Sequence, residues 1–251
     1  MNVRAFVISL RRTPQRLAWF LSTNTTANTQ YEWVAGIDGL EIQDCLRNSR
    51  LVSSQALENW TPGSIGSALS HLYCWQKCLS LNEPILVLED DAVLAPDWAK
   101  QIKYLAQQQL DWDLLLLGWN YNSVLQSRCE AGIETIRLFE PAFPSHEQIQ
   151  AVFDLNREHQ LERLICTFGL PGYLISPQGA KTLLNKLPPL HSNMLPMTSG
   201  IPATKPTTLD GMLNHFYPRI KAWVVNPPLA IALNDPNTSL TLDRPTIQNF
   251  G

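Results

Sequence analysis

The chain of 251 residues is 45% hydrophobic and 16% charged, a balance that excludes intrinsic disorder and allows a packed core without disulfide or metal staples. Nineteen basic and 22 acidic side chains give a formal net charge of -3, so the chain lacks the overall basic surface that drives nucleic-acid binding. No linker-like stretch divides the sequence, and we therefore expect a single domain over residues 1–251.

Cysteine usage and short apolar segments indicate the compartment. Five cysteines are an odd number and form no Cys-x-x-Cys pair, which argues against a disulfide framework or zinc ribbon and favours reducing conditions. His71 and Cys78 would stand roughly 10 Å apart on a helix and cannot share one ion, so we expect Cys74 and Cys78 to face the core. The apolar stretches are too short for a membrane span or a signal peptide. We expect a cytoplasmic protein, at most peripherally bound to the inner face of the cytoplasmic membrane.

Hydrophobic patterns predict strands that alternate with helices along the chain. The runs that fit strands are residues 3–10, 31–35, 85–88, 113–117, 133–138, 173–175 and 220–225. Helices are predicted to begin at Pro14 after the N-cap Thr13, at an N-cap Ser64, at Pro96, at Ser145 and at Pro177 after the N-cap Ser176. The helix from Ser145 is expected to reach Leu164. Residues 188–206 are predicted to form a long surface loop, and residues 234–251 a polar tail.

This alternation predicts an α/β sandwich around a mostly parallel central sheet. In such sheets, ligands bind beyond the carboxyl ends of the strands. The first three predicted strands end in polar segments, which are residues 9–12, 35–39 and 89–91. We therefore expect a ligand site at these strand ends.

The most informative segment is Glu89-Asp90-Asp91, three adjacent carboxylates that end an apolar strand. Their repulsion is costly near a core unless a cation neutralises it, and hard ions such as Mg²⁺ or Mn²⁺ take oxygen ligands together with substrate phosphates. Side chains i and i+2 of an extended segment point the same way, so Glu89 and Asp91 can face one ligand while Asp90 faces elsewhere. The alternative is a solvated acidic loop or a helix-start cluster. An aspartyl phosphatase motif fits poorly, because a glutamate takes its first position.

Several sequence blocks occur in a specific order, and it is their joint order that is informative. They are Val7-Ile-Ser-Leu-Arg-Arg with Arg16, Ala35-Gly-Ile-Asp-Gly39, Gly66-Ser-Ala-Leu-Ser-His71 with Trp75, Val87-Leu-Glu-Asp-Asp91, Trp112-Asp-Leu-Leu-Leu-Leu-Gly118, Gly172-Tyr-Leu-Ile-Ser176 with Gly179-Ala-Lys181, Leu209-Asp210 and Asn226-Pro-Pro-Leu229. Over about residues 3–230, this series resembles glycosyltransferase family 25, the lipopolysaccharide and lipooligosaccharide galactosyltransferase family. One block departs from the family, since Gly63-Ser-Ile-Gly-Ser67 stands where Gly-Glu-x-Gly-Cys is usual.

The resemblance implies a GT-A-like, Rossmann-like fold that transfers a hexose from a UDP-sugar, foremost UDP-galactose, to a saccharide hydroxyl of lipopolysaccharide or a related glycan, with inversion and with Mn²⁺ or Mg²⁺. Residues 1–118 would form the nucleotide and metal half, and residues 119–233 the acceptor half. The implied metal ligands are Asp91 and Glu89, and the implied donor contacts are Leu10, Arg12, Arg16, Ala35, Asp38, His71, Glu89 and Asp90. Asp210 is the implied catalytic base, which takes the acceptor proton.

Several of these roles have a structural alternative. Arg12 and Arg16 suit oxyanions because their planar donors pair bidentately with oxygen, but an exposed arginine pair is also common. His71 could be a structural histidine, and Asp210 could be a helix N-cap. Because Ser64 replaces a family carboxylate, the alternative function is a catalytically inactive homologue that binds nucleotide sugar or glycan.

Overall fold

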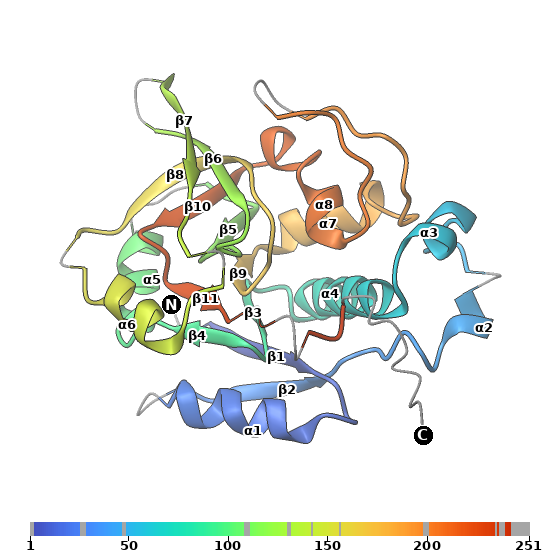
Figure 1. The fold of residues 1–251 in the computed structure, drawn as a ribbon, viewed down its shortest axis with the longest axis horizontal. Helices are drawn as coiled ribbons and strands as arrows, with labels where there is room; N and C mark the ends of the chain where they lie inside the picture. The colour runs from blue at the N-terminus through green and yellow to red at the C-terminus, as the bar shows by residue number, and fades with distance from the viewer. Residues whose placement is uncertain are drawn as a thin grey trace, which may run out of the picture.

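A nine-stranded sheet forms the central layer of the computed structural model, which describes residues 3–25, 29–46, 49–107, 111–129, 132–141, 143–155, 157–197, 201–233, 235 and 239–241 (Figure 1). The strands are β1 (Arg4–Ser9), β2 (Tyr31–Ala35), β3 (Ile85–Glu89), β5 (Leu114–Leu116), β6 (Val124–Arg128), β7 (Glu134–Leu138), β8 (Gln160–Cys166), β9 (Gly172–Ile175) and β10 (Ala222–Asn226). Their spatial order is β2-β1-β3-β9-β5-β10-β8-β6-β7. Two further strands, β4 (Ala92–Leu94) and β11 (Ala230–Ala232), form a separate antiparallel pair.

The central sheet is mixed. β1 pairs in parallel with β2 and β3, and β10 pairs in parallel with β5, whereas β9, β8 and β7 run antiparallel to their neighbours. The α/β class around a large sheet is confirmed, but the expectation of mostly parallel pairing needs correction. A buried strand gives the same apolar run in either orientation, so the sequence pattern could not distinguish the two. The parallel trio of β2, β1 and β3 brings its three carboxyl ends to one edge.

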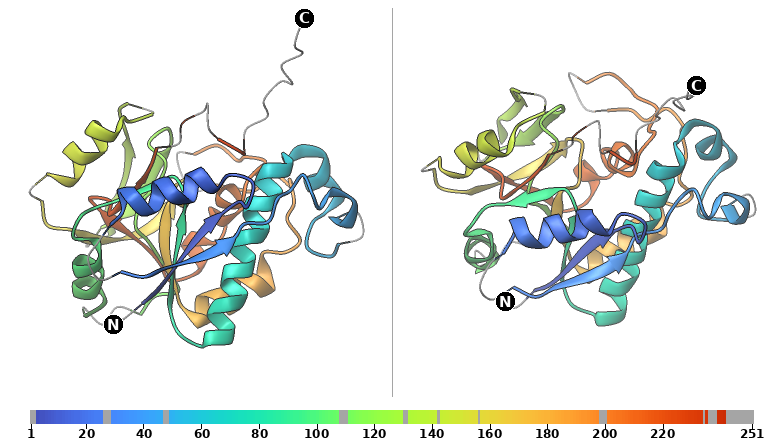
Figure 2. Two further views of the ribbon diagram at one scale, coloured as in Figure 1. Left: turned by 90° about the horizontal axis from the view of Figure 1, so that it is seen from below. Right: turned by 60° about the horizontal axis from the view of Figure 1, so that its bottom comes forward.

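Helices cover both faces of the sheet (Figures 1 and 2). They are α1 (Pro14–Thr23), α2 (Gln43–Leu46), α3 (Ser54–Asn59), α4 (Pro62–Leu81), α5 (Trp98–Gln107), α6 (His146–Phe153), α7 (Pro177–Lys186) and α8 (Leu209–Leu213), with a 3-10 turn at Tyr217–Arg219. Side chains of β3 alternate between two cores: Ile85 and Val87 share one with α4 and α7, and Leu86 and Leu88 share the other with α1 and α5. Because both faces of β3 are buried, its polar end is fixed at the sheet edge.

Helix starts differ slightly from the sequence prediction. α4 begins at Pro62, because Thr61 rather than Ser64 is the N-cap and its hydroxyl accepts a hydrogen bond from Ser64 N. α5 begins at Trp98, two residues after the predicted Pro96. The predicted starts of α1 and α7 at prolines are confirmed.

Helix α4 packs closely against the loop that follows β2. A Cβ atom on Gly66 would lie 2.3 Å from the Ile37 carbonyl oxygen, a backbone contact that only glycine permits here. Cys74 and Cys78 on the same helix are fully buried, as predicted, and the five cysteines are free thiols. Within the described ranges, no helix combines the length and apolar character needed to cross a membrane.

The largest error of the sequence prediction lies in residues 145–164. Helix α6 does begin after the Ser145 N-cap, but it ends at Phe153, and the chain then forms β8 between β10 and β6. β6 was likewise not predicted. Glu162 and Arg163 give β8 the charged character of an exposed helix, and only strand pairing brings Glu162 into the protein interior.

The predicted surface loop at residues 188–206 is anchored to the rest of the fold at its described residues. Leu190 forms a parallel bridge with Val52, and Leu195 forms an antiparallel bridge with Thr204. Leu190 is fully buried, and so is most of the Ser192 side chain. This segment is therefore irregular but packed against its surroundings.

A partly buried ion pair joins β7 to β8. Arg137 donates hydrogen bonds to both carboxylate oxygens of Glu162, at 2.6 and 3.0 Å, and only 7% of the Glu162 side chain is exposed. Burial alone would raise the pKa of Glu162, but hydrogen bonds from Arg137, Ser127 and Asn226 outweigh burial and lower it. A lowered pKa in the folded state stabilises the protein above the unfolded-state value, and this stabilisation is lost as the pH falls through the folded-state value.

We expect Glu162→Gln to reduce the free energy of unfolding at pH 7 by about 1–3 kcal/mol, because Arg137 loses its charged partner. The variant should also lose less stability than the wild type when the pH is lowered. Urea denaturation at a series of pH values measures both effects. Glu41→Gln, at an exposed carboxylate, is the matched control and should change neither. This interpretation would be contradicted if the free energy of unfolding of Glu162→Gln fell as steeply toward low pH as that of the wild type.

Candidate functional site

A cavity of about 310 Å³ opens at the sheet edge where β1, β2 and β3 end. We call it the acidic cavity. Its lining residues are Ile8, Ser9, Leu10, Arg12, Arg16, Gly36–Gly39, Gly63, Ser64, Ser67, Ser70, His71, Glu89–Asp91, Asn120, Asn122, Gly169, Leu170, Thr208–Asp210, Ala232 and Ser239–Thr241. Its volume is within the range of small-molecule sites, and its position agrees with the ligand site expected beyond the strand ends.

Part of the predicted polar tail forms one wall of the acidic cavity. Residues 239–241 pack onto the start of α4, where the Thr61 hydroxyl donates a hydrogen bond to the Thr241 carbonyl oxygen at 2.8 Å. A Cβ atom on Gly63 would lie 1.9 Å from the Leu240 carbonyl oxygen. The remaining residues of 234–251, apart from residue 235, lie outside the described part of the chain.

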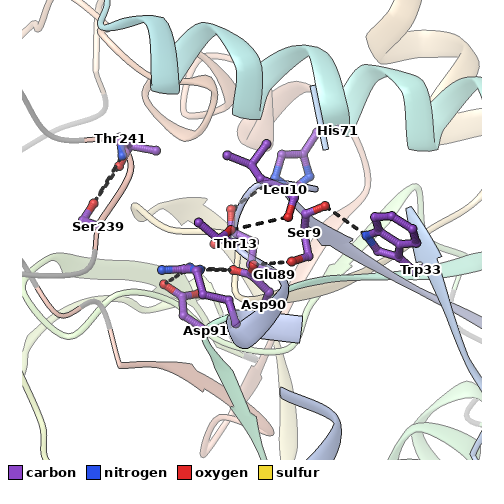
Figure 3. Close-up of polar contacts among 11 residues, drawn as sticks. Ser9, Leu10, Thr13, Trp33, His71, Glu89, Asp90, Asp91, Ser239 and Thr241 are labelled. Carbon is purple, nitrogen blue, oxygen red and sulfur yellow. Dashed lines mark hydrogen bonds and ion pairs between the residues drawn. The ribbon is translucent and has the colours of Figure 1, made fainter. Parts of the chain in front are cut away.

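Asp90 is the anchored carboxylate of the acidic segment (Figure 3). It is buried, and Ser9 donates a hydrogen bond to its Oδ2 at 2.7 Å. Arg16 donates to its Oδ1 from Nε at 2.8 Å and from Nη2 at 2.5 Å. These contacts tie the end of β3 to β1 and α1. Asp90 lines the acidic cavity like its two neighbours, but its carboxylate is bonded to Ser9 and Arg16.

Glu89 and Asp91 leave incompletely neutralised charge in the acidic cavity. Their side chains are 30% and 27% exposed, and Asp91 Oδ1 is buried without a hydrogen-bond partner among the described residues. Asp91 Oδ2 lies 3.5 Å from Arg16 Nη2. Burial, followed by the charges of Asp210 and Asp90, raises the pKa of Glu89 to about 8. Burial and the charge of Glu89 raise the pKa of Asp91 to about 7. A cation between these carboxylates would relieve both effects.

His71 connects Glu89 to two buried aromatic side chains. Its Nε2 lies 3.2 Å from Glu89 Oε1, and its Nδ1 lies 2.9 Å from the Tyr173 hydroxyl. That hydroxyl also accepts a hydrogen bond from Trp75 Nε1 at 2.9 Å. His71, Tyr173 and Trp75 are each at most 1% exposed, so this chain of polar contacts is shielded from solvent.

The direction of these hydrogen bonds follows from the donor inventory. The indole N–H of Trp75 can only donate, so the Tyr173 oxygen accepts from it. The Tyr173 hydroxyl proton then has one acceptor among its described contacts, which is His71 Nδ1. In the tautomer that satisfies the Tyr173 hydroxyl, His71 carries its proton on Nε2 and donates a hydrogen bond to Glu89. Burial lowers the pKa of His71 to about 4, which keeps the ring neutral and consistent with this tautomer.

Asp210 reaches the acidic cavity from α8. The N-cap of that helix is Thr208, so the alternative interpretation of Asp210 as the N-cap is wrong. Its Oδ2 accepts a hydrogen bond from Gly169 N at 2.6 Å, and its Oδ1 accepts one from Gly211 N at 2.9 Å. Gly169 has a φ of +92°, a conformation that favours glycine. The charge of Asp210 also contributes to the raised pKa of Glu89, so the two carboxylates interact electrostatically.

The structure brings together all but one of the residues predicted for the site. Leu10 and the ion pairs Arg12–Asp38 and Arg16–Asp90 line the acidic cavity together with His71, Glu89, Asp91 and Asp210. Ala35 does not line it. The reason is that Ala35 still belongs to β2, where it is in register with Ser9, and the chain enters the cavity wall only from Gly36 onward.

Two asparagines and a serine are among the wall residues that sequence reasoning did not assign to the site. Asn120 and Asn122 follow β5, which runs in the same direction as β3 and ends at the same edge. The polar residues directly after the apolar run Leu114–Gly118 could have indicated this part of the site from the sequence. Ser70 of α4 was missed because its role is a long-range contact, in which its hydroxyl accepts a hydrogen bond from Ile37 N at 2.8 Å.

The chemistry of the two carboxylates fits a hard divalent cation. Glu89 and Asp91 offer oxygen donors, and Asp91 Oδ1 has no hydrogen-bond partner in the part of the chain that the structure describes. Among the residues that the structure describes, no set of three His, Cys, Asp or Glu side chains is arranged to hold a metal ion. Both nitrogens of His71 are already engaged. The protein would therefore supply one or two ligands, and a diphosphate and water the others, as is usual for Mg²⁺-type sites.

Ligands of α/β sheets bind beyond the carboxyl ends of parallel strands, and the acidic cavity lies at such ends. Residues 2–197 match the family model described as "Glycosyltransferase family 25 (LPS biosynthesis protein)". The chain belongs to glycosyltransferase family 25, as its sequence blocks indicated.

Curated relatives agree with this membership. A "Glycosyltransferase 25 family member" of Aedes aegypti is 26% identical over 98% of this chain and 39% of its own length. "Procollagen galactosyltransferase 1" of Danio rerio is 27% identical over 67% of this chain and 25% of its own length. A "Probable inactive glycosyltransferase 25 family member 3" of Rattus norvegicus is 28% identical over 45% of this chain and 22% of its own length. The chain thus spans well under half the length of these relatives.

We expect Tyr173→Phe to release the tautomer of His71, because Nδ1 loses the proton donor that makes it an acceptor. Nitrogen-15 NMR of the imidazole nitrogens at neutral pH should find the Nε2–H tautomer in the wild type and a mixture in the variant. Tyr104→Phe, at an exposed tyrosine outside this network, is the control and should preserve the wild-type tautomer. Finding Nδ1–H as the dominant tautomer of wild-type His71 would contradict the hydrogen-bond direction derived above.

Proposed function

We propose that this chain is a glycosyltransferase that transfers a hexose from a UDP-sugar, with UDP-galactose the expected donor, to a saccharide hydroxyl with inversion. The observation that carries the proposal is one cavity that holds two incompletely neutralised carboxylates, Glu89 and Asp91, and a third, Asp210, on a separate element. The GT-A-like classification and the dependence on Mn²⁺ or Mg²⁺ are parts of this proposal.

In this mechanism, Glu89 and Asp91 would hold the cation. When bound, the cation would supply Lewis-acid stabilisation of the charge on departing UDP. Asp90, held by Ser9 and Arg16, keeps the segment in place, and His71 fixes the orientation of Glu89. These contacts position the binding groups before the donor arrives, which reduces the cost of ordering them on binding.

Asp210 would act as the general base. The acceptor oxygen forms a bond to C1 of the donor sugar, the bond between C1 and the UDP oxygen breaks, and the acceptor proton passes to the Asp210 carboxylate. The N–H groups of Gly169 and Gly211 hold one oxygen each of that carboxylate, which fixes its plane. Each oxygen keeps a further lone pair for the proton.

Family membership and the names of relatives support the transferase class. The zebrafish relative is named a procollagen galactosyltransferase, which favours galactose as the transferred sugar. The description of the family model names lipopolysaccharide biosynthesis, which favours a surface glycan or its lipid-linked precursor as acceptor. A cytoplasmic location, at most peripheral at the membrane, remains a prediction from the sequence.

A second function, nucleotide-sugar binding without turnover, is favoured by one observation. Ser64 stands where the family usually has a glutamate, and its hydroxyl lies in the acidic cavity within 2.9 Å of Thr61 Oγ1. The cavity therefore has one carboxylate fewer than the family pattern. Assaying UDP release from a panel of UDP-sugars with Mn²⁺, with and without a chelator, separates the two functions, since binding without release would support the second.

We expect Asp91→Asn to reduce Mn²⁺-dependent UDP release from UDP-galactose by about 100-fold or more, because the cation loses a charged ligand. Calorimetric titration with UDP and Mn²⁺ should record weaker binding of the pair. Asp111→Asn, at an exposed aspartate that does not line the acidic cavity, is the matched control and should behave like the wild type. Unchanged metal dependence in Asp91→Asn would refute the cation site.

We expect Asp210→Asn to retain UDP binding while kcat falls by about 10²- to 10⁴-fold, the usual effect of removing a general base. Thermal unfolding of the same variant checks that the hydrogen bonds from Gly169 and Gly211 still support the fold. A loss of UDP affinity as large as the loss of kcat would make Asp210 a donor contact instead of the base.

A further inference from the structure

A second depression, which we call the aromatic groove, adjoins the acidic cavity. It has a volume of about 670 Å³ and is lined by Asn120–Val124, Leu138–Glu140 and Phe168. Asn120 and Asn122 line both depressions. Phe168 directly precedes Gly169, whose N–H is bonded to Asp210. The aromatic groove therefore meets the acidic cavity on the side where Asp210 is held.

The aromatic groove combines ring faces with neutral polar groups. Phe139 stacks on Tyr121 at a centroid distance of 5.0 Å and an interplanar angle of 20°, and Phe168 lies half-buried in the same wall. The Asn122 side chain is exposed, so its amide is accessible to a ligand. Glu140, at the rim, adds a hydrogen-bond acceptor.

The charge of this lining selects the class of ligand. The described residues that line the groove include no lysine or arginine, which argues against a diphosphate or a phosphorylated headgroup. A pyranose ring carries an apolar C–H face that can pack on an aromatic ring and hydroxyl groups that can pair with amides and carboxylates. This combination of a ring face with a few convergent polar groups is typical of sites for small neutral ligands.

We propose that the aromatic groove binds the acceptor saccharide and directs one of its hydroxyl groups toward Asp210. Phe139 and Phe168 supply the ring faces, and Asn122 supplies a hydrogen bond. This proposal rests on the proposed glycosyltransferase function, because it places the acceptor beside the base of that reaction. It adds the position of the second substrate and the residues that hold it.

The competing use of this surface is contact with a second copy of the chain. β7 is an edge strand of the sheet, and Ile136 and Leu138 on it are 50% and 81% exposed. Exposed edge strands can pair with another chain. The aromatic groove itself is polar at Asn122 and Glu140, which favours a saccharide over a flat apolar interface.

The test uses methyl β-D-galactopyranoside, methyl β-D-glucopyranoside and methyl α-D-mannopyranoside as probes, one at a time, in saturation-transfer NMR with the full chain. Phe139→Leu and Phe168→Leu remove a ring face while they keep an apolar side chain. Phe143→Leu, at an exposed phenylalanine outside the groove, is the matched control. Calorimetric titration with UDP and Mn²⁺ reports on the acidic cavity in every variant and confirms that the variant is folded.

We expect at least one probe to bind the wild type and the Phe143→Leu control, and to bind about three- to tenfold more weakly to either groove variant that retains UDP binding. No probe binding to the wild type, or equal binding to all variants, would overturn the proposal. The proposal would also be overturned if the groove variants lost probe binding together with a dimer that sedimentation velocity detects in the wild type. Failure of the proposed function is distinguishable, because it appears as absent UDP binding in the wild type.

Discussion

The buried bonds from Arg16 and Ser9 to Asp90 are the constraint on which the site depends. Three adjacent carboxylates at a strand end would repel one another and disorder the segment unless part of their charge were neutralised. The structure neutralises the central one with a guanidinium from α1 and a hydroxyl from β1. With Asp90 neutralised by these bonds, the remaining negative charge of the segment lies on Glu89 and Asp91, which line the same cavity.

His71 plays the complementary role for Glu89. A buried neutral imidazole that donates from Nε2 favours the carboxylate form of its partner, although burial and neighbouring charges oppose ionisation of Glu89. The Tyr173 hydroxyl stabilises this arrangement because it donates a hydrogen bond to Nδ1 of His71. The site therefore combines one fully neutralised carboxylate with two that retain a demand for positive charge, a division suited to a cation shared with a diphosphate.

Sheet topology determines where these groups meet. β2, β1 and β3 run in parallel and deliver the carboxylates and arginines to one edge, whereas β9 runs antiparallel and delivers the Gly169–Leu170 turn that precedes it to the same edge. Asp210, Gly169 and Asn120 thus join the acidic cavity from the second half of the chain. The mixed sheet also extends to β7, whose end forms part of the aromatic groove.

The sequence by itself determined the α/β class, the first three strands, the acidic strand end and the family, because each depends on local patterns such as apolar runs, proline at helix starts and motif order. It also predicted, from the side-chain alternation of an extended chain, that Glu89 and Asp91 face one ligand, and both line the acidic cavity. The tertiary structure alone decided that β8 is a strand, that Ala35 lies outside the cavity, that Thr208 caps α8, and that Asn120 and Asn122 line the site. These features depend on contacts between residues distant in sequence, such as Glu162 with Arg137 and Gly169 with Asp210, and pairing energy between distant segments leaves no trace in local periodicity.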